Sequence, residues 1–433
     1  MSEPSFDVDK VSYEIFSILE SKFLFAGDGA APALSSKAPF STGRVRILSV
    51  DAGGPTDGLI AAASLARLES SLRNLSGQPS ARVADFFDVA AGSGAGGVLV
   101  ALLFTRGAGG HPLFSAAEAL DFLGRNRRAL QPTRKKKRPG IPGIFRRERA
   151  GGSPGRILRR VFGEATLRDT VKPVLIPCYD MATRAPFLFS RADAVETGGY
   201  NFLMREVCTA TVGAARMRSV DGNTAIVAVD GGVAAGNPTA AAITHVLNNR
   251  VEFPSASGVE DLLVVSLGNG ESGAGAAGAS WGGKQGRGNC TASPPSTSEI
   301  VQIAGEGASD MVDQAVAMSF GRNRTTHYVR IQARVCDSGK FQWSRGGAEV
   351  AGAAEELLEQ RSIESVLFRG KAVSEKTNAE KLDWVTGELV REQQGRKSCP
   401  HPVVVVKQGS PRSSCCSAFS SRSDSPTTVA SPR

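Results

Sequence analysis

The sequence predicts an α/β fold with a mainly parallel central sheet and helices on both of its faces. Short apolar stretches of strand length alternate with longer stretches whose apolar residues recur at helical spacing. Glycine-rich turns follow three of the apolar stretches, as they do where a strand leads directly into a helix. The chain has 433 residues, 41% of them hydrophobic, which allows one large domain with a substantial core.

The beginning of the chain departs from this alternation. Residues 11–25 carry apolar side chains at helical spacing, and a linker rich in Gly, Ala, Pro and Ser follows. We therefore expect an N-terminal helix and linker over 1–43 and a main domain over 44–395. The first ten residues lack the basic and apolar regions of a secretory signal, so we expect a cytoplasmic protein that is not secreted.

The main domain is expected to alternate between strands and helices from its first residues onward. A strand over 46–50 precedes a helix over 58–72, and a strand over 85–91 precedes a helix over 94–104. Further strands are expected at 172–179, 186–190, 224–229, 262–267 and 328–332, and further helices at 202–214, 239–248, 298–319, 353–368 and 378–393. In a parallel sheet the carboxyl ends of the strands share one edge, so the glycine-rich turns should cluster there.

Three segments have the composition of irregular structure. Arg125 to Arg160 holds 14 Lys and Arg but one acidic residue, which suits a solvated insertion or an anionic membrane surface. Nucleic acid is not expected to bind there, because aromatic residues that would stack on bases are not interleaved. Residues 271–296 predict a flexible loop, and residues 396–433 a disordered tail with a short edge strand at 403–406.

The seven cysteines predict neither a disulfide framework nor a zinc site. Their number is odd, and no CxxC pair or nearby His has ligand spacing. We expect no metal and no cofactor. Cys415 and Cys416 are adjacent in the serine-rich tail, where they are either acylated or unmodified thiols. No apolar run is long enough to span a bilayer, so no transmembrane helix is expected.

Three glycine-rich turns carry the candidate chemistry. They are 51–54 (Asp-Ala-Gly-Gly), 92–97 (Gly-Ser-Gly-Ala-Gly-Gly) and 230–232 (Asp-Gly-Gly). Successive N–H groups at the start of a helix favour an anion or a developing oxyanion. The second turn also fits the dinucleotide pattern, but the acidic ribose partner and the Lys-Ser/Thr pair of a P-loop are missing. The turns therefore predict an oxyanion site rather than a nucleotide site.

Together and in this order, the turns resemble the motifs of the patatin-like phospholipase family. The matching stretches are RILSVDAGG at 46–54, DFFDVAAGSGAGG at 85–97, VDGGV at 229–233 and LLVVSLGNG at 262–270. The resemblance implies a three-layer sandwich and a Ser/Asp dyad, in which the Ser attacks the ester and the Asp takes its proton. Carried over by position, Asp230 is the base, Gly53 and Gly54 are the oxyanion donors, and Gly94 stands where the family has its nucleophile. The other motif positions are Asp51, Gly92, Gly96, Gly97, Gly231 and Gly232.

Gly-x-Gly-x-Gly at this place resembles the group III branch of plant patatin-related proteins, as do SYEIFSILESKFLF at 12–25, ESVLFRG at 364–370 and NAEKLD at 378–383. This resemblance implies a membrane-associated enzyme of lipid degradation that releases fatty acid from phospholipids and galactolipids. The alternative is an inactive lipid-binding or regulatory protein.

Several interpretations of the site residues remain open at this point. Ser93 could replace the missing nucleophile, or Asp230 could activate water directly. The first turn is one residue longer than the family's and lacks its basic residue, which alters the oxyanion loop. The glycines could serve strand-to-helix packing, and Asp230 could simply cap a turn.

Overall fold

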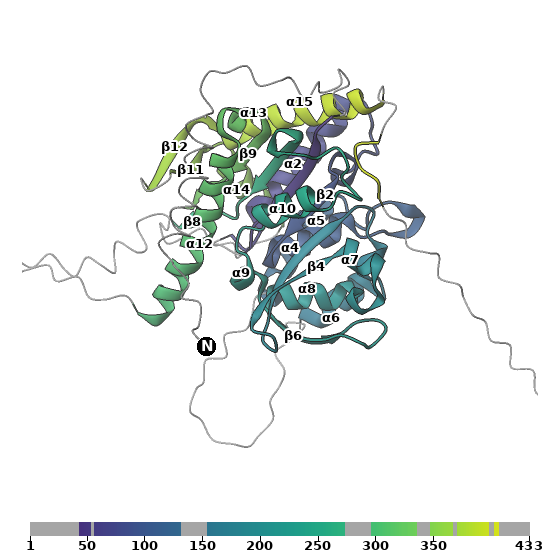
Figure 1. The fold of residues 1–433 in the computed structure, drawn as a ribbon. Coiled ribbons are helices and arrows are strands. Elements are labelled where there is room, and N and C mark those ends of the chain that lie inside the picture. Colours follow the sequence, from purple (N-terminus) through teal and green to yellow (C-terminus); the bar gives the residue numbers. More distant parts are fainter. Residues whose placement is uncertain are drawn as a thin grey trace, which may run out of the picture. The chain divides into compact units, whose positions relative to one another are not determined.

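A computed structural model gives the fold, and it describes residues 43–52, 56–130, 154–272, 296–335, 347–366, 370–397 and 402–406. All of these belong to the compact unit that begins at Thr42 (Figure 1). The expected N-terminal helix, Gly53 and Gly54, most of the basic segment, and Cys415 and Cys416 lie outside the described residues. The proposed domain boundaries stay a prediction.

The centre of the fold is an eight-stranded sheet of order β5-β6-β3-β2-β1-β7-β9, with β4 paired to β3. From β3 to β9 all neighbours are parallel, whereas β4, β5 and β6 run antiparallel to their partners. The predicted mainly parallel sheet is therefore confirmed. Its strands are β1 (Val45–Val50), β2 (Val89–Gly92), β3 (Val174–Asp180), β4 (Ala185–Ser190), β5 (Ala214–Arg218), β6 (Ala225–Val229), β7 (Leu262–Leu267) and β9 (Tyr328–Ile331).

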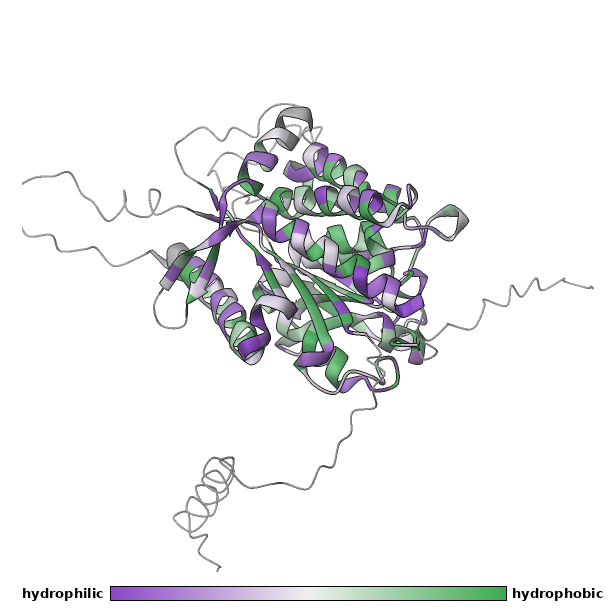
Figure 2. Cartoon of the chain, turned by 90° about the horizontal axis from the view of Figure 1, so that it is seen from above, coloured by the Kyte–Doolittle hydropathy of each residue, from purple (hydrophilic) through white to green (hydrophobic). Residues whose placement is uncertain are grey.

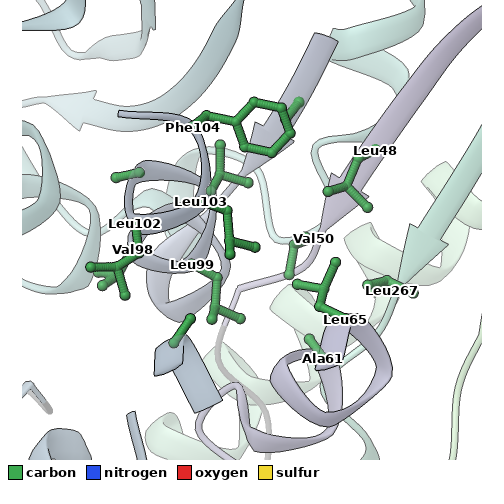
Figure 3. Close-up of a cluster of buried hydrophobic side chains, with 14 of the residues drawn as sticks. Leu48, Val50, Ala61, Leu65, Val98, Leu99, Leu102, Leu103, Phe104 and Leu267 are labelled. Carbon is green, nitrogen blue, oxygen red and sulfur yellow. The ribbon is translucent and has the colours of Figure 1, made fainter. Parts of the chain in front are cut away.

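Side chains of β1 alternate between two hydrophobic clusters, one on each face of the sheet. Leu48 and Val50 join the larger cluster with helices α2 (Leu59–Ser76) and α4 (Gly94–Phe104), as Figure 3 shows. Val45 and Ile47 join the other cluster with α10 (Thr239–Asn248) and α12 (Thr297–Ser319). Both faces of the parallel strands are thus covered, and Figure 2 shows hydrophobic strands between helices of mixed hydropathy. The fold is a three-layer α/β/α sandwich.

The remaining described elements surround this core. Among the described residues, no helix is both long enough and apolar enough to cross a membrane. The helices and strands around the core are α3 (Val83–Phe86), α5 (Ala116–Leu130), α6 (Pro154–Phe162), α7 (Arg191–Glu196), α8 (Met204–Val212), α9 (Gly231–Ala234), α13 (Arg324–His327), α14 (Gly347–Leu358), α15 (Asn378–Lys397), β8 (Glu271–Ser272), β10 (Arg334–Val335), β11 (Arg361–Val366) and β12 (Gly370–Thr377).

Two predicted elements were wrong in type over part of their length. The strand expected at 85–91 begins only at Val89, because Asp85 accepts a hydrogen bond from the Arg82 N–H (2.8 Å) and closes a helical turn. The helix expected at 353–368 ends at Leu358. Residues 361–366 form β11 instead, because they pair with the antiparallel strand β12, which the sequence did not predict.

Two boundaries and one short strand also differ from the expectation. The helix expected at 202–214 ends at Val212, because Ala214 pairs with Val229 in the sheet. The basic insertion is helical at both of its described ends, in α5 up to Leu130 and in α6 from Pro154. Residues 403–406 form no strand, although Val403 is buried and the Val405 N–H donates to the Glu252 carbonyl (2.8 Å).

Candidate functional site

The turn between β2 and α4 has the shape of a nucleophile elbow but no side chain at its tip. Gly94 is the first residue of α4 and has φ +51°, in the left-handed region that strains residues with a side chain. Its N–H donates to Thr211 Oγ1 (2.9 Å), and the Ser93 N–H donates to the Val50 carbonyl (3.1 Å). The strained strand-to-helix turn typical of such an elbow is therefore present at Gly94.

The other glycines of this turn are required by close packing. A Cβ on Gly92 would lie 2.4 Å from the Gly96 carbonyl oxygen, and a Cβ on Gly96 would lie 2.4 Å from the Val50 carbonyl oxygen. On Gly97, a Cβ would lie 2.9 Å from Thr211 Cγ2. These distances are far below van der Waals contact, so α4 can begin against the end of β1 only with glycine at these positions. A structural role accounts for all three.

Ser93 does not reach the surface of the site. It is fully buried, and within the described residues its hydroxyl has no hydrogen-bond partner. Its Oγ lies only 2.9 Å from where a Cβ on Gly231 would be, so it faces the back of the Asp230 turn. A nucleophile must be accessible to substrate. This placement does not favour Ser93 as the replacement nucleophile.

Asp230 reaches the same edge of the sheet by an unexpected route. Strand β3 extends past the end of β2, and β6 returns antiparallel beside it, with Val229 opposite Tyr179. Asp230 follows at once and therefore lies near the carboxyl ends of the parallel strands. The sequence analysis placed Asp230 at this edge by assuming that β6 is parallel to its neighbours. The position of Asp230 agrees with that expectation, but the assumed direction of β6 was wrong.

The Asp230 carboxylate is half-buried at the start of α9. Its Oδ1 accepts a hydrogen bond from the Gly232 N–H (2.9 Å), so it does cap a turn. Burial raises its pKa, and the Gly232 bond offsets part of that increase. A Cβ added to Gly232 would lie 3.1 Å from Ala52 Cβ and 3.2 Å from Asp230 Oδ1. The acid therefore lies beside the loop that follows β1.

A buried ion pair anchors the beginning of that loop. Arg330, on β9, donates to Asp51 Oδ2 (2.6 Å) and to Ser266 Oγ (2.8 Å), and its Nε lies 3.8 Å from Asp313. Burial lowers the pKa of Arg330, but the charges of Asp51 and Asp313 more than offset this and raise it above its ordinary value. Asn269 Nδ2 donates to the Asp51 carbonyl (2.5 Å). The loop is thus fixed at its first residue.

Sequence reasoning missed two residues that hold these turns. Arg330 was visible as a charge within the apolar strand Tyr-Val-Arg-Ile, a pattern that indicates a buried partner. Thr211 gave no such signal. Its hydroxyl accepts from the Gly94 N–H and donates to the Pro177 carbonyl (3.1 Å), and it packs against Gly231. It joins the elbow turn to the Asp230 turn.

Asp230 lines a cavity of about 530 Å³ at the sheet edge. We call it the Asp230 cavity. Its wall comprises Asp51 and Ala52 after β1, the turn from Asp230 to Gly236, the turn from Asn269 to Glu271, one side of α12 from Gln302 to Asp310, and Arg330, Gln332 and Lys371. This volume is typical of a small-molecule or lipid headgroup site. Among the described residues, no group of His, Cys, Asp or Glu could hold a metal.

The cavity can support base-assisted hydrolysis. Asp230 offers a carboxylate with a raised pKa, and the N-terminus of α4 supplies a partial positive charge toward the same edge. The oxyanion donors assigned from the resemblance, Gly53 and Gly54, lie outside the described residues and stay a prediction.

Comparison with known proteins adds independent information. The family model "Patatin-like phospholipase" matches residues 48–243. The chain is 51% identical to patatin-like protein 3 of Oryza sativa subsp. japonica, over 90% of this chain and 92% of the relative. It is 47% identical to patatin-like protein 7 of Arabidopsis thaliana, over 94% and 86%. It is also 40% identical to a probable inactive patatin-like protein 9 of Arabidopsis thaliana, over 91% and 95%.

Proposed function

The chain belongs to the patatin-like phospholipase family, and from this premise we propose that it is a lipid acyl hydrolase in which Asp230 activates water directly. One observation carries the proposal. The Asp230 carboxylate lines a cavity at the edge where the elbow turn ends, while the tip of that turn, Gly94, has no side chain to form an acyl-enzyme. The base is present and the nucleophile is not.

The reaction then needs one water molecule and no covalent intermediate. Asp230 removes a proton from water as the oxygen attacks the ester carbonyl carbon, and the partial charge at the start of α4 stabilises the oxyanion. The tetrahedral intermediate collapses with cleavage of the bond to the alcohol oxygen. Asp230 returns its proton to that oxygen, so fatty acid and alcohol leave and the carboxylate is regenerated. Phospholipids and galactolipids are the proposed substrates.

Three variants assayed side by side test this proposal. Purified wild type should release fatty acid from phosphatidylcholine and monogalactosyldiacylglycerol without a burst of the alcohol product. Asp230→Asn should lose about 100-fold to 10,000-fold of that rate, because the amide cannot accept the proton. Gly94→Ser should show a burst, since a serine at the tip can be acylated. Equal rates for wild type and Asp230→Asn would contradict the mechanism.

A second candidate is a lipid-binding protein without catalysis. The absence of a side chain at Gly94 favours it, and so does the 40% identity to a relative whose name says it is probably inactive. This candidate predicts that wild type and Asp230→Asn both bind lipid with equal affinity and release no fatty acid.

Peripheral contact with a membrane is part of the proposal, and the outer face of α12 supports it. Ile300, Ala304, Met311, Ala315 and Met318 are all exposed and recur at helical spacing, so an apolar stripe faces solvent beside the cavity. Such a stripe suits the surface of a lipid bilayer. Figure 1 shows α12 projecting beyond the sheet.

Sedimentation with neutral phosphatidylcholine vesicles tests this contact. Met311→Asp should reduce the bound fraction about tenfold, because a charge replaces an apolar side chain that the bilayer would bury. Val251→Asp is the matched control, since Val251 is also exposed but lies outside the stripe and the cavity lining. Equal binding by both variants would contradict a role for α12.

A further inference from the structure

The described lining of the Asp230 cavity is strongly acidic. It contains the five carboxylates of Asp51, Asp230, Glu271, Glu306 and Asp310, with Arg330 and Lys371 as its cations. With all of these groups ionised, the wall carries three more negative than positive charges. A bound headgroup therefore meets a negative potential on several sides.

Both cations of this lining are already paired with carboxylates. Arg330 Nη2 lies 2.6 Å from Asp51 Oδ2, and Lys371 Nζ lies 2.7 Å from Glu271 Oε2 and 3.3 Å from Asp310 Oδ2. An anionic headgroup would have to break one of these pairs to gain a cation. In the described part of the wall, no cation remains free for it.

Two hydrogen-bond acceptors of the lining, by contrast, have no partner within the described part of the chain. Asp51 Oδ1 and Asn269 Oδ1 belong to residues that are 5% and 2% exposed, and neither atom has a hydrogen-bond partner among the described residues. A buried acceptor without a partner is costly, and a ligand that donates a hydrogen bond relieves that cost. Glu306, on α12, accepts from Gln302 Nε2 (2.8 Å) and has no cation beside it in the described ion pairs.

Resting on the proposed function of this cavity, we propose that its acidic wall selects lipids by headgroup charge. It accepts headgroups that carry hydrogen-bond donors and no net negative charge, such as ethanolamine or galactose, and it excludes headgroups with an added acidic group. Glu306 is the specificity-determining residue that can be tested cleanly, because Asp51 anchors the loop after β1 through Arg330 and Asp230 is the proposed base. Its place on exposed α12 makes its replacement compatible with folding.

The test uses two lipids that differ by a single acidic group. Dihexanoyl phosphatidylethanolamine and dihexanoyl phosphatidylserine are monomeric in solution, so binding to a bilayer does not contribute. Fatty acid release gives kcat/KM for each, and calorimetric titration gives the Kd. Wild type should prefer the ethanolamine lipid by about tenfold, which is the Coulomb effect of one charge about 6 Å away in a partly solvated site.

Glu306→Lys should reduce this preference at least about threefold, and Glu306→Gln by less, because the first variant changes the charge by two units. Glu356→Lys is the control. It changes the net charge of the protein equally, at an exposed position of α14 outside the cavity lining. A ratio that falls with Glu306→Lys and not with Glu356→Lys would support the inference.

Two results would overturn the inference. One is equal handling of the two lipids by wild type, and the other is an equal effect of both lysine variants. Failure of the proposed function looks different. If no variant releases fatty acid but the Kd values still show the charge preference and its loss in Glu306→Lys, the selectivity stands and catalysis is refuted. Hydrolysis without headgroup preference would leave the function intact and refute the selectivity.

Discussion

The β2–α4 turn and the β6–α9 turn meet at one edge of the sheet, but they differ in what each contributes to the site. The first retains the backbone of an elbow, with Gly94 at φ +51°, and lacks a reactive side chain at its tip. The second carries the carboxylate of Asp230, the proposed base, on the wall of the cavity. Thr211 touches both turns. The comparison teaches that packing preserves the shape of a site separately from its chemistry.

Packing explains why the elbow keeps its glycines without its serine. Gly92, Gly96 and Gly97 are fixed by contacts with backbone atoms of the turn and of β1 and with the Thr211 side chain, and a change at any of them would disturb the core. The tip residue, Gly94, is held through its backbone, since its N–H donates to Thr211 Oγ1 (2.9 Å). The turn can therefore lose its nucleophile and keep its geometry.

The largest expected effect comes from breaking the elbow at Gly96. Gly96→Ala places a Cβ 2.4 Å from the Val50 carbonyl oxygen, so β1 and α4 must separate. We expect the free energy of unfolding to fall by about 3 kcal/mol, measured by urea denaturation.

Gly352→Ala is the matched control for this change. Gly352 lies within helix α14, and a Cβ there meets nothing within 4 Å. This variant should be more stable than wild type by about 0.5–1 kcal/mol, because alanine favours the helix. If Gly96→Ala were as stable as Gly352→Ala, the elbow would not be held by packing.

A smaller effect is expected at the tip itself. Gly94→Ser puts a side chain at positive φ, which should reduce the free energy of unfolding by about 1–2 kcal/mol. The same variant places a hydroxyl at the tip of the turn. Denaturation therefore measures the cost of the strain, and Gly94→Ala separates that cost from any interaction of the hydroxyl. A Ser variant more stable than the Ala variant by over about 1 kcal/mol would indicate a hydrogen bond to the site.

The sequence predicted the parallel core and the turns at its edge because their signals are local. Apolar strands, helical periodicity and glycine-rich turns are each contained within about a dozen residues. The hairpin of β11 and β12 was missed because the type of residues 361–366 depends on a partner strand. The antiparallel direction of β6 was missed for the same reason, since pairing with β3 involves residues about 50 positions apart.

The candidate site was predictable to a similar extent. Asp230 and Gly94 could be found because they occupy motif positions. The acidic wall of the cavity could not be predicted. The side chains that line it, among them Glu306, Lys371 and Arg330, come from α12, β12 and β9 and meet only in the folded chain. The pairing of Arg330 with Asp51 spans 279 positions. No local pattern reports such a contact.

The smallest expected effect concerns the stability cost of keeping Asp230 charged. Its pKa in the folded protein is raised above the ordinary 3.8 by burial, so the folded state binds the proton more tightly than the unfolded state. Ionisation at pH 7 therefore destabilises the fold, and this cost disappears as the pH falls below 3.8. Asp230→Asn should raise Tm at pH 7, since the amide oxygen can still accept from the Gly232 N–H. The difference in Tm between this variant and wild type should shrink toward zero as the pH is lowered.

Thermal unfolding of both proteins across pH 3.5 to 7 measures this difference in Tm. A lower Tm for the variant at pH 7 would mean that the carboxylate stabilises its turn instead.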